Sequence, residues 1–393
     1  MCALPDESWN RRLDETYGKL RLEIKERARD RGIYEEEAIR NLILEAVRPY
    51  AFRERVCLGK RLFDSLCGMD VLEPLMQDEA ITDIMVNGAE RIFFVKDGRM
   101  RRSQRGFESE ERLEDLIQQI VGSVNRTVNE ADPIADARLP DGSRVSVVLP
   151  PVSLSGAVLT IRKFRTDPIT MEEMIQNGSA DERIAAFLKQ AVAERKNIFV
   201  CGATSSGKTT LLNILSSYID PSERVITIED SAELQLRDLP NVVTLETRNS
   251  NHSGSREISM RDLIKASLRM NPDRIIIGEV RDAAAVDMLS GLNTGHSGMS
   301  TGHANSCRDM LRRIENMVLT GGDMPLEAIR QQIASALDLM VFLEKGRDGR
   351  RRIVEIVRVL DTVNGEVQIE TLMKRKGERF VWSADALSMT SFD

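Results

Sequence analysis

The chain has 393 residues, of which 41% are hydrophobic, and its 55 basic and 62 acidic side chains give a formal net charge of −7. This length predicts two or three domains, and the composition is that of a globular protein rather than a disordered one. The acidic balance and the low aromatic content of 4% argue against direct binding of nucleic acid.

The sequence predicts a cytoplasmic protein. Its first residues are polar and lack the apolar stretch of a signal peptide. No run approaches the roughly 18 apolar residues that cross a bilayer, so we expect no transmembrane segment. A C-x-x-C pair, typical of a zinc or redox site, is absent among the cysteines at positions 2, 57, 67, 201 and 307. Because no transmembrane segment is expected, any membrane role would come through a partner.

Residues 1–73 are predicted to form an N-terminal helical extension. Between residues 10 and 67 the sequence is charged and helix-prone, with apolar residues recurring at spacings of three and four and a break at Gly32. This pattern fits either a small helical bundle or a solvated amphipathic arm. It also leaves open a dedicated role in docking a partner.

An α+β domain is predicted from residue 74 to residue 164. Short strands are expected at 81–86, 91–95, 144–149 and 157–164, separated by Asn-Gly and Asp-Gly turns. A helix is expected over 109–124, because Ser109 is a good N-cap and two glutamates follow it. Short strands with one or two helices are typical of this fold class.

Residues 165–176 are interpreted as a linker to a C-terminal domain over 177–393. Apolar strands without alternation are expected there at 197–201, 224–228 and 274–277, and a helix at 209–218. Buried strands with helices between them predict a parallel sheet covered on both faces, and hence an α/β domain.

The strongest chemical signal is a glycine-rich stretch between the first of these strands and its helix. It fits the pattern G-x-x-x-x-G-K-[ST] and comprises Gly202, Ala203, Thr204, Ser205, Ser206, Gly207, Lys208 and Thr209, followed by Thr210. Glycines let successive N–H groups face one point, and the helix N-terminus adds partial positive charge there. Lys208 is expected to reach the β- and γ-phosphates, and Thr209 to ligate Mg²⁺. The alternative is a plain glycine turn.

Acidic residues end the other two buried strands. Glu279 follows the third strand, where it could hold the water shell of Mg²⁺ or form a structural ion pair. Glu229, Asp230 and Glu233 follow the second strand, and one of them could orient or deprotonate a water molecule. The alternative for this acidic box is a charged turn.

Histidines and arginines complete the candidates. His296 and His303 lie in a glycine-rich segment that should be a loop or strand returning to the site, where an imidazole could sense the γ-phosphate. Arg138, Arg144 and Arg162 of the smaller domain could stabilise phosphoryl charge or form surface ion pairs. Composition alone does not rank these three.

In order and spacing, these motifs resemble those of the secretion-superfamily ATPases, over roughly residues 70–360. Within that superfamily the chain is most similar to the CpaF-like Tad/Flp pilus assembly ATPases, which have relatives in type II and type IV secretion. The segments that carry this closer resemblance are IMVNG at 84–88, DARLPDGSRV at 136–145, TIRKF at 160–164 and STGHANS at 300–306.

The resemblance implies a RecA-like core and assigns roles within it. Glu233 is expected to be the general base and Glu279 the Walker B acid, while His303 senses nucleotide. Arg144 and Arg162 match arginines of the smaller domain that reach the phosphates.

The resemblance also implies an ATP-hydrolysing, hexameric ring motor with ATP and Mg²⁺ as ligands. Such a motor is expected to act peripherally at the inner membrane on a platform protein that assembles pilin. Two alternatives remain for the function: a nucleic-acid motor on the same core, or a nucleotide-gated scaffold with little turnover.

Overall fold

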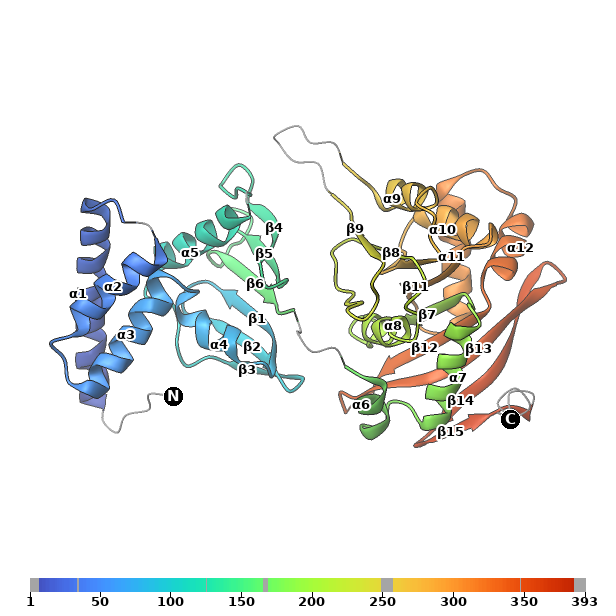
Figure 1. Cartoon of the computed structure of the whole chain (residues 1–393), viewed down its shortest axis with the longest axis horizontal. Helices are drawn as coiled ribbons and strands as arrows, with labels where there is room; N and C mark the ends of the chain where they lie inside the picture. Colours follow the sequence, from blue (N-terminus) through green and yellow to red (C-terminus); the bar gives the residue numbers. More distant parts are fainter. Residues whose placement is uncertain are drawn as a thin grey trace. The chain divides into compact units, whose positions relative to one another are not determined.

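The computed structural model describes residues 7–33, 35–124, 126–164, 169–248, 257–346 and 348–384. The chain divides into two compact units, Met1–Thr166 and Asp167–Asp393. Figure 1 labels the helices and strands of both units along the sequence. Of the predicted linker, residues 165–168 lie outside the described residues.

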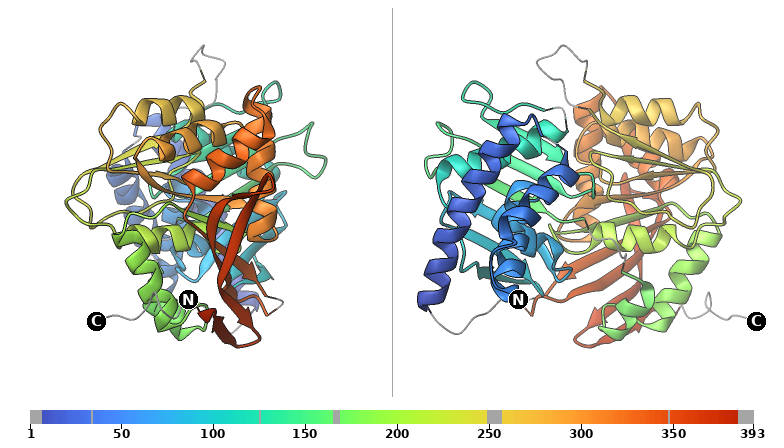
Figure 2. Two further views of the ribbon diagram at one scale, coloured as in Figure 1. Left: turned by 90° about the vertical axis from the view of Figure 1, so that its right-hand side faces the viewer. Right: turned by 60° about the vertical axis from the view of Figure 1, so that its left-hand side comes forward.

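The first unit opens with three helices that pack against one another. Their buried faces share one core, which includes Ile24 of the first helix, Ile43 of the second and Leu62 of the third. Figure 2 shows these helices in blue. Since their apolar faces are covered, the extension is a packed bundle rather than a solvated arm. The helices are α1 (Glu7–Asp30), α2 (Glu36–Val47) and α3 (Phe52–Leu66).

The rest of the first unit is an antiparallel sheet with helices, as the sequence predicted. Its six strands have the order β3-β2-β1-β6-β5-β4. The hydroxyl of Ser109 accepts from the backbone N–H of Arg112 at 3.2 Å, which confirms the predicted N-cap. The elements are η1 (Asp70–Leu72), α4 (Glu73–Gln77), β1 (Ile81–Asn87), β2 (Ile92–Lys96), β3 (Arg99–Arg102), α5 (Glu110–Ser123), β4 (Ile134–Arg138), β5 (Arg144–Val148) and β6 (Val158–Arg162). Strands β3 and β4 had not been predicted.

A buried arginine ties the helical bundle to the sheet domain. Arg112 of α5 donates from Nε to Asp70 Oδ2 at 2.6 Å and from Nη2 to the carbonyl oxygen of Ser65. Its side chain is only 7% exposed and that of Asp70 11%. Removal of one partner would leave the other charge buried and uncompensated, which is strongly destabilising.

We expect Arg112→Ala to lower the free energy of unfolding of the first unit by about 3 kcal/mol or more. The surface pair Arg12–Glu54, in which Arg12 is 69% exposed, provides the control, and Arg12→Ala should cost about 1 kcal/mol or less. Urea denaturation of the full chain followed by circular dichroism would measure both. Equal effects of the two substitutions would contradict the role given to Arg112.

The second unit is built on a nine-stranded sheet with the order β15-β14-β13-β12-β7-β11-β10-β8-β9. The strands from β12 to β9 in this order are parallel, and β13, β14 and β15 add an antiparallel extension that the sequence analysis did not predict. The strands are β7 (Ile198–Gly202), β8 (Val225–Glu229), β9 (Val242–Glu246), β10 (Arg274–Ile277), β11 (Ser297–His303), β12 (Leu339–Lys345), β13 (Arg351–Val363), β14 (Glu366–Lys376) and β15 (Arg379–Trp382).

Helices cover both faces of the parallel strands, as predicted. Phe199 and Cys201 of β7 pack into the core formed with α9 to α12, whereas Ile198 and Val200 pack on the opposite face with α6 to α8. Figures 1 and 2 show the green helices and the yellow-orange helices on opposite sides of the sheet. Because both faces are buried, these strands are continuously apolar. The helices are α6 (Met171–Gln176), α7 (Glu182–Ala193), α8 (Lys208–Ser216), α9 (Met260–Ser267), α10 (Ala284–Asn293), α11 (Cys307–Gly321) and α12 (Leu326–Ala336).

Helix α6 corrects the predicted extent of the linker. Residues 171–176 were assigned to it, yet they form a helix of the second unit. Thr170 caps this helix by accepting from the backbone N–H of Glu173, and Met171 and Met174 are buried in the core beneath it. The linker prediction missed this short amphipathic helix, whose one local signal is its threonine cap.

Candidate functional site

Four parallel strands end at the same edge of the large sheet, and the sequence-predicted site residues follow them. Strand β7 ends at Gly202, β8 at Glu229, β10 at Ile277 and β11 at His303. The register places His303 beside Gly202. Strand β7 lies between β11 and β12, so the chain leaves it at the point where the strand order reverses. In α/β sheets this is where ligands bind.

The phosphate loop, residues 202–209, has the backbone geometry that an anion requires. Gly207 is the N-cap residue of α8 and has a φ of +98°, in the left-handed region. A residue with a side chain would be strained in this conformation. Gly202 packs against the carbonyl oxygen of Leu343, so a Cβ at Gly202 would collide with β12. The strand–turn–helix context predicted for this motif is confirmed.

Two features of the described residues fit a bound phosphate. Helix α8 has no side-chain N-cap, so N–H groups of its first turn, which includes Thr209 and Thr210, stay available to an anion. The hydroxyl of Ser206 is buried without a hydrogen-bond partner among these residues. An anion in the loop would give it an acceptor. The exposed Ala203, Thr204 and Ser205 form the outer part of the loop.

Lys208, the first residue of α8, folds back over the loop. Its Nζ donates to the carbonyl oxygens of Gly202 at 3.2 Å and Ala203 at 3.0 Å, and it contacts Nδ1 of His303 at 3.2 Å. Burial lowers the pKa of Lys208, and the nearby Glu279 carboxylate opposes this shift. The ammonium group therefore lies at the hollow of the loop, close to an acid and a histidine.

His303 connects Lys208 to Glu279. Its Nε2 lies 3.0 Å from Glu279 Oε1. An ammonium group can only donate, so Nδ1 of His303 accepts from Lys208 and the ring proton resides on Nε2, which donates to Glu279. Burial lowers the pKa of His303, as does the positive charge of Lys208, while Glu279 raises it. The favoured form is thus a neutral imidazole with a defined tautomer.

We expect an NMR titration to place the midpoint of His303 below 6.5, the ordinary value of its pKa. Because the fold favours the neutral ring, the contribution of His303 to stability is complete above this unfolded-state pKa. It is lost as the pH falls from 6.5 toward the lower folded-state pKa. Lys208→Met should move the midpoint upward, since it removes a neighbouring positive charge. A midpoint at or above the ordinary value in the unaltered chain would contradict this arrangement.

The acids that follow β8 are not equivalent. Glu229 is 3% exposed, and its Oε1 accepts from the backbone N–H groups of Glu233 at 3.0 Å and Leu234 at 3.2 Å. Its carboxylate therefore fixes the turn that carries Glu233. Asp230 forms an ion pair with Arg281, whose Nε lies 3.6 Å from Glu279 Oε1. Arg281 thus links the acidic box to the acid after β10.

The structure separates two residues that the sequence had grouped. His296 lies just before β11, at the opposite end of the strand from His303, and its Nδ1 is 3.3 Å from the carbonyl oxygen of Gly291. The glycine-rich segment that contains both histidines forms strand β11, one of the two predicted forms, but only His303 lies at the carboxyl edge of the sheet. A strand of seven residues holds its two ends too far apart for both histidines to reach one ligand.

The candidate arginines belong to the first unit, where they form a row across three strands. Arg138 of β4 is opposite Arg144 of β5, which is opposite Arg162 of β6. Arg138 donates from Nε to the carbonyl oxygen of Gly142 at 3.3 Å and lies over the ring of Phe164. Like charges placed directly opposite one another are unfavourable in a sheet.

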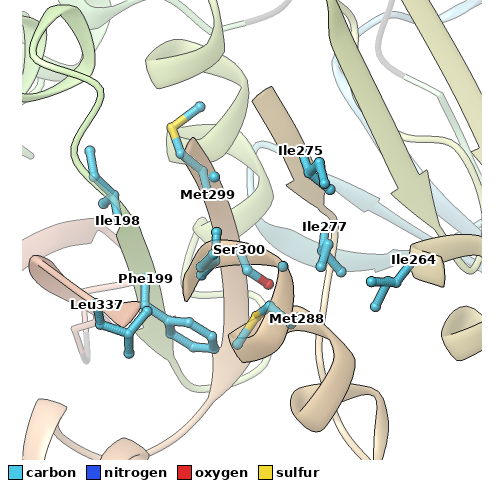
Figure 3. Close-up of a pocket in the computed structure, with 12 residues that line it drawn as sticks. Ile198, Phe199, Ile264, Ile275, Ile277, Met288, Met299, Ser300 and Leu337 are labelled. Atoms are coloured by element: carbon cyan, nitrogen blue, oxygen red, sulfur yellow. The ribbon is translucent and has the colours of Figure 1, made fainter. Parts of the chain in front are cut away.

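A pocket elsewhere in the large unit is a packing gap rather than a ligand site. It lies between the sheet and helices α9 and α10, and it holds about one water molecule at most. Figure 3 shows its apolar side chains with the hydroxyl of Ser300 among them. The lining includes Ile198, the first residue of β7, and Leu337, which precedes β12, so the gap lies at the amino end of these strands, away from the phosphate loop.

Comparisons with known proteins give a consistent result. A family model described as type II/IV secretion system protein matches residues 66–390. A putative conjugal transfer protein of Mycobacterium tuberculosis is 36% identical over 327 residues, which cover 81% of this chain and 90% of that protein. The type IV secretion system protein PtlH of Bordetella pertussis is 32% identical over 315 residues, which cover 73% and 93%.

The solved structure of the pilus retraction motor PilT with bound ADP shares the fold. It has a TM-score of 0.53 and 20% identity, and it covers 78% of this chain and 84% of that one. The predicted α/β fold, a RecA-like core with a smaller α+β domain, is thereby confirmed. In the described part of the chain, no helix has both the length and the apolarity needed to span a bilayer.

Proposed function

Because the chain belongs to the type II/IV secretion system protein family, a family of P-loop secretion ATPases, we propose that it hydrolyses ATP as a ring-forming motor. The observation that carries this proposal is the meeting of Lys208, His303 and Glu279 at the carboxyl edge of the sheet. These residues come from three separate strand ends and converge on a loop shaped for phosphate. Such convergence is what phosphoryl transfer requires of an active site.

In the proposed site, residues 202–210 hold the phosphates through backbone N–H groups and Lys208. A neutral His303 bonded to Lys208 is well placed to sense nucleotide, because a phosphate that draws the ammonium group away would break this hydrogen bond. Thr209 and Glu279 are proposed to hold Mg²⁺, partly through water. When bound, the ion would neutralise charge developing on the transferred phosphoryl group.

Glu233 is proposed as the general base that orients or deprotonates the attacking water. Support comes from the different states of the two glutamates. Glu229 is almost fully buried and its carboxylate accepts backbone N–H groups. Glu233 is only half-buried on the turn that Glu229 holds, so its side chain is the one better able to meet a water molecule.

Arg144 and Arg162 are proposed to stabilise the phosphates, from the same subunit or from a neighbouring one. Their opposed positions on β5 and β6 concentrate positive charge. Guanidinium groups delivered to phosphoryl oxygens raise turnover strongly in other P-loop enzymes.

We further propose that the motor is a hexamer that serves Tad/Flp-type pilus assembly or a related secretion system. It would act at the cytoplasmic face of the inner membrane through a platform protein. The names of the relatives, which refer to conjugal transfer, type IV secretion and pilus retraction, support a role of this kind. The segments at 84–88, 136–145 and 160–164 support the Tad/Flp branch.

The test is the ATPase rate per subunit against protein concentration. If active sites are completed between subunits, the specific activity should rise as rings form and level off when assembly is complete. Arg144→Ala and Arg162→Ala should remove this rise while leaving the mass of the assembly unchanged. A concentration-independent rate from a particle with the mass of a monomer would contradict a shared site.

A further inference from the structure

Arg351, at the start of β13, lies over the outer side of the phosphate loop. Its Nε donates to the carbonyl oxygen of Ser205 at 3.0 Å. Its Cδ lies 3.2 Å from the position that a Cβ on Gly207 would occupy. One arginine therefore spans the loop from Ser205 to Gly207, although 146 positions separate it from Ser205 in the sequence.

The backbone of Arg351 is held in place from two sides. Its partner on β12 is Lys345, in the strand that lies next to β7. Its carbonyl oxygen accepts from the hydroxyl of Ser179 at 2.5 Å, and the backbone N–H of Ile353 donates to the carbonyl oxygen of Ser179 at 3.0 Å. A side chain that starts from such an anchored backbone can fix the position of the group it contacts.

The contact controls which way a strained peptide faces. Ser205 has a φ of +59°, in the left-handed region that non-glycine residues seldom adopt. Within the loop, the N–H of Ser206 donates to the carbonyl oxygen of Ala203 at 3.2 Å. The C=O and N–H of a trans peptide point in opposite directions, so the bond from Arg351 and this inner bond stabilise the same orientation of the 205–206 peptide.

We propose that Arg351 is a positioning residue for the phosphate loop, which keeps the Ser205 carbonyl oxygen out of the anion-binding hollow. A carbonyl oxygen turned into the hollow would repel the β-phosphate of a nucleoside di- or triphosphate. The guanidinium also adds positive charge beside the loop. The inference deepens the proposed function and rests on it, because it concerns the affinity of that same site for nucleotide.

The neighbouring arginines provide a contrast. Arg352 pairs with Asp348, and the backbone N–H of Arg350 donates to Oδ1 of the same Asp348 at 3.1 Å. Among these three arginines, only Arg351 has a side-chain hydrogen bond to the phosphate loop in the part of the chain that the structure describes. Arg350→Gln therefore removes the same charge from the same turn without touching the loop, and it is the matched control.

The experiment compares the full-length chain with Arg351→Gln, Arg351→Lys and Arg350→Gln. Affinities for ADP, for ATP and for adenosine are measured at equilibrium without Mg²⁺. In Arg351→Gln, the loss of one charge-assisted hydrogen bond should lower the affinity for ADP and for ATP by about tenfold. Adenosine binding should stay unchanged, because adenosine has no phosphate. Arg351→Lys should recover most of the affinity, and Arg350→Gln should match the unaltered chain.

Two further measurements separate positioning from a general loss of structure. The KM for ATP should rise about tenfold in Arg351→Gln while kcat stays within about twofold, since the interaction is the same in ground and transition states. Hydrogen exchange in residues 203–207 of the nucleotide-free protein should quicken in Arg351→Gln but not in Arg350→Gln. If the glutamine variant does not fold, Arg351→Met takes its place, because it also removes the donor and the charge and is expected to show the same loss of about tenfold.

The outcomes are distinguishable. If the unaltered chain binds ADP and Arg351→Gln binds it equally well, the inference about Arg351 is wrong and the proposed function stands. If Arg351→Lys shows the full defect and adenosine binding also falls, the effect is a general disruption and the inference is likewise wrong. If the unaltered chain binds neither ADP nor ATP, the proposed function fails and the inference fails with it.

Discussion

Lys208→Ala is expected to weaken the binding of ADP and ATP on the order of a hundredfold or more and to abolish ATP hydrolysis. Lys208 is 7% exposed, and its ammonium group lies at the hollow of the phosphate loop, within 3.2 Å of two loop carbonyl oxygens. Two charge-assisted hydrogen bonds to phosphate contribute about 3 kcal/mol or more, and each 1.4 kcal/mol is a factor of about ten. Isothermal titration with ADP would measure the loss.

Lys208→Ala should not lower the free energy of unfolding as it lowers nucleotide affinity. Burial of the Lys208 ammonium group is itself unfavourable, as its lowered pKa indicates. Lys196 provides a control at the other end of β7. It is 43% exposed and lies 3.9 Å from Asp338, so Lys196→Ala should leave nucleotide binding unchanged. If Lys208→Ala binds ADP within about threefold of the unaltered chain, the loop does not bind phosphate in the proposed way.

Glu233→Gln is expected to preserve nucleotide binding and to lower kcat at saturating ATP by about a hundredfold or more, the usual contribution of a general base. The amide has nearly the same shape as the carboxylate but cannot accept a proton from water. The measurement is a steady-state ATPase assay at assembled-ring concentrations, alongside equilibrium binding of ATP. Binding should change by less than about twofold, because the chemical step is affected rather than the loop.

Glu229→Gln distinguishes a catalytic acid from a structural one. Its buried carboxylate accepts two backbone N–H groups of the turn after β8. The substitution should therefore lower the melting temperature, which Glu233→Gln should leave unchanged. Unchanged turnover in Glu233→Gln would remove it as the base. A loss of turnover in Glu229→Gln, without any loss of stability, would transfer that role to Glu229.

Several elements could be predicted because the information lies within a few residues. The N-cap Ser109 and the helix after it, the buried strand β7 and the strand–turn–helix around Gly207 all depend on local patterns. A motif of this kind specifies the backbone shape of its own loop, since glycine spacing and strand and helix periodicity act over short distances. The smaller α+β domain was predicted from its strand and turn signals and the RecA-like core through the family resemblance, and both are confirmed.

Other features were missed or wrong where a weak local signal competed with packing. The short helix α6 lies in a segment that had been assigned to the linker, because a single threonine cap is a weak local signal. Strands β13 to β15 went unpredicted, and they extend the sheet beyond β12. The roles of Glu233, His303, Arg144 and Arg162 stay predictions.

The sequence by itself identified the phosphate loop, because one continuous stretch from Gly202 to Thr209 contains the glycines, the lysine and the threonine of the motif. Only the tertiary structure decided what surrounds this loop. The order of the strands brings His303 and Glu279 to Lys208, takes His296 to the far end of β11, and lays Arg351 over Ser205. Strand order follows from how alternate apolar residues pack on both faces of the sheet, and that packing joins segments far apart in the chain.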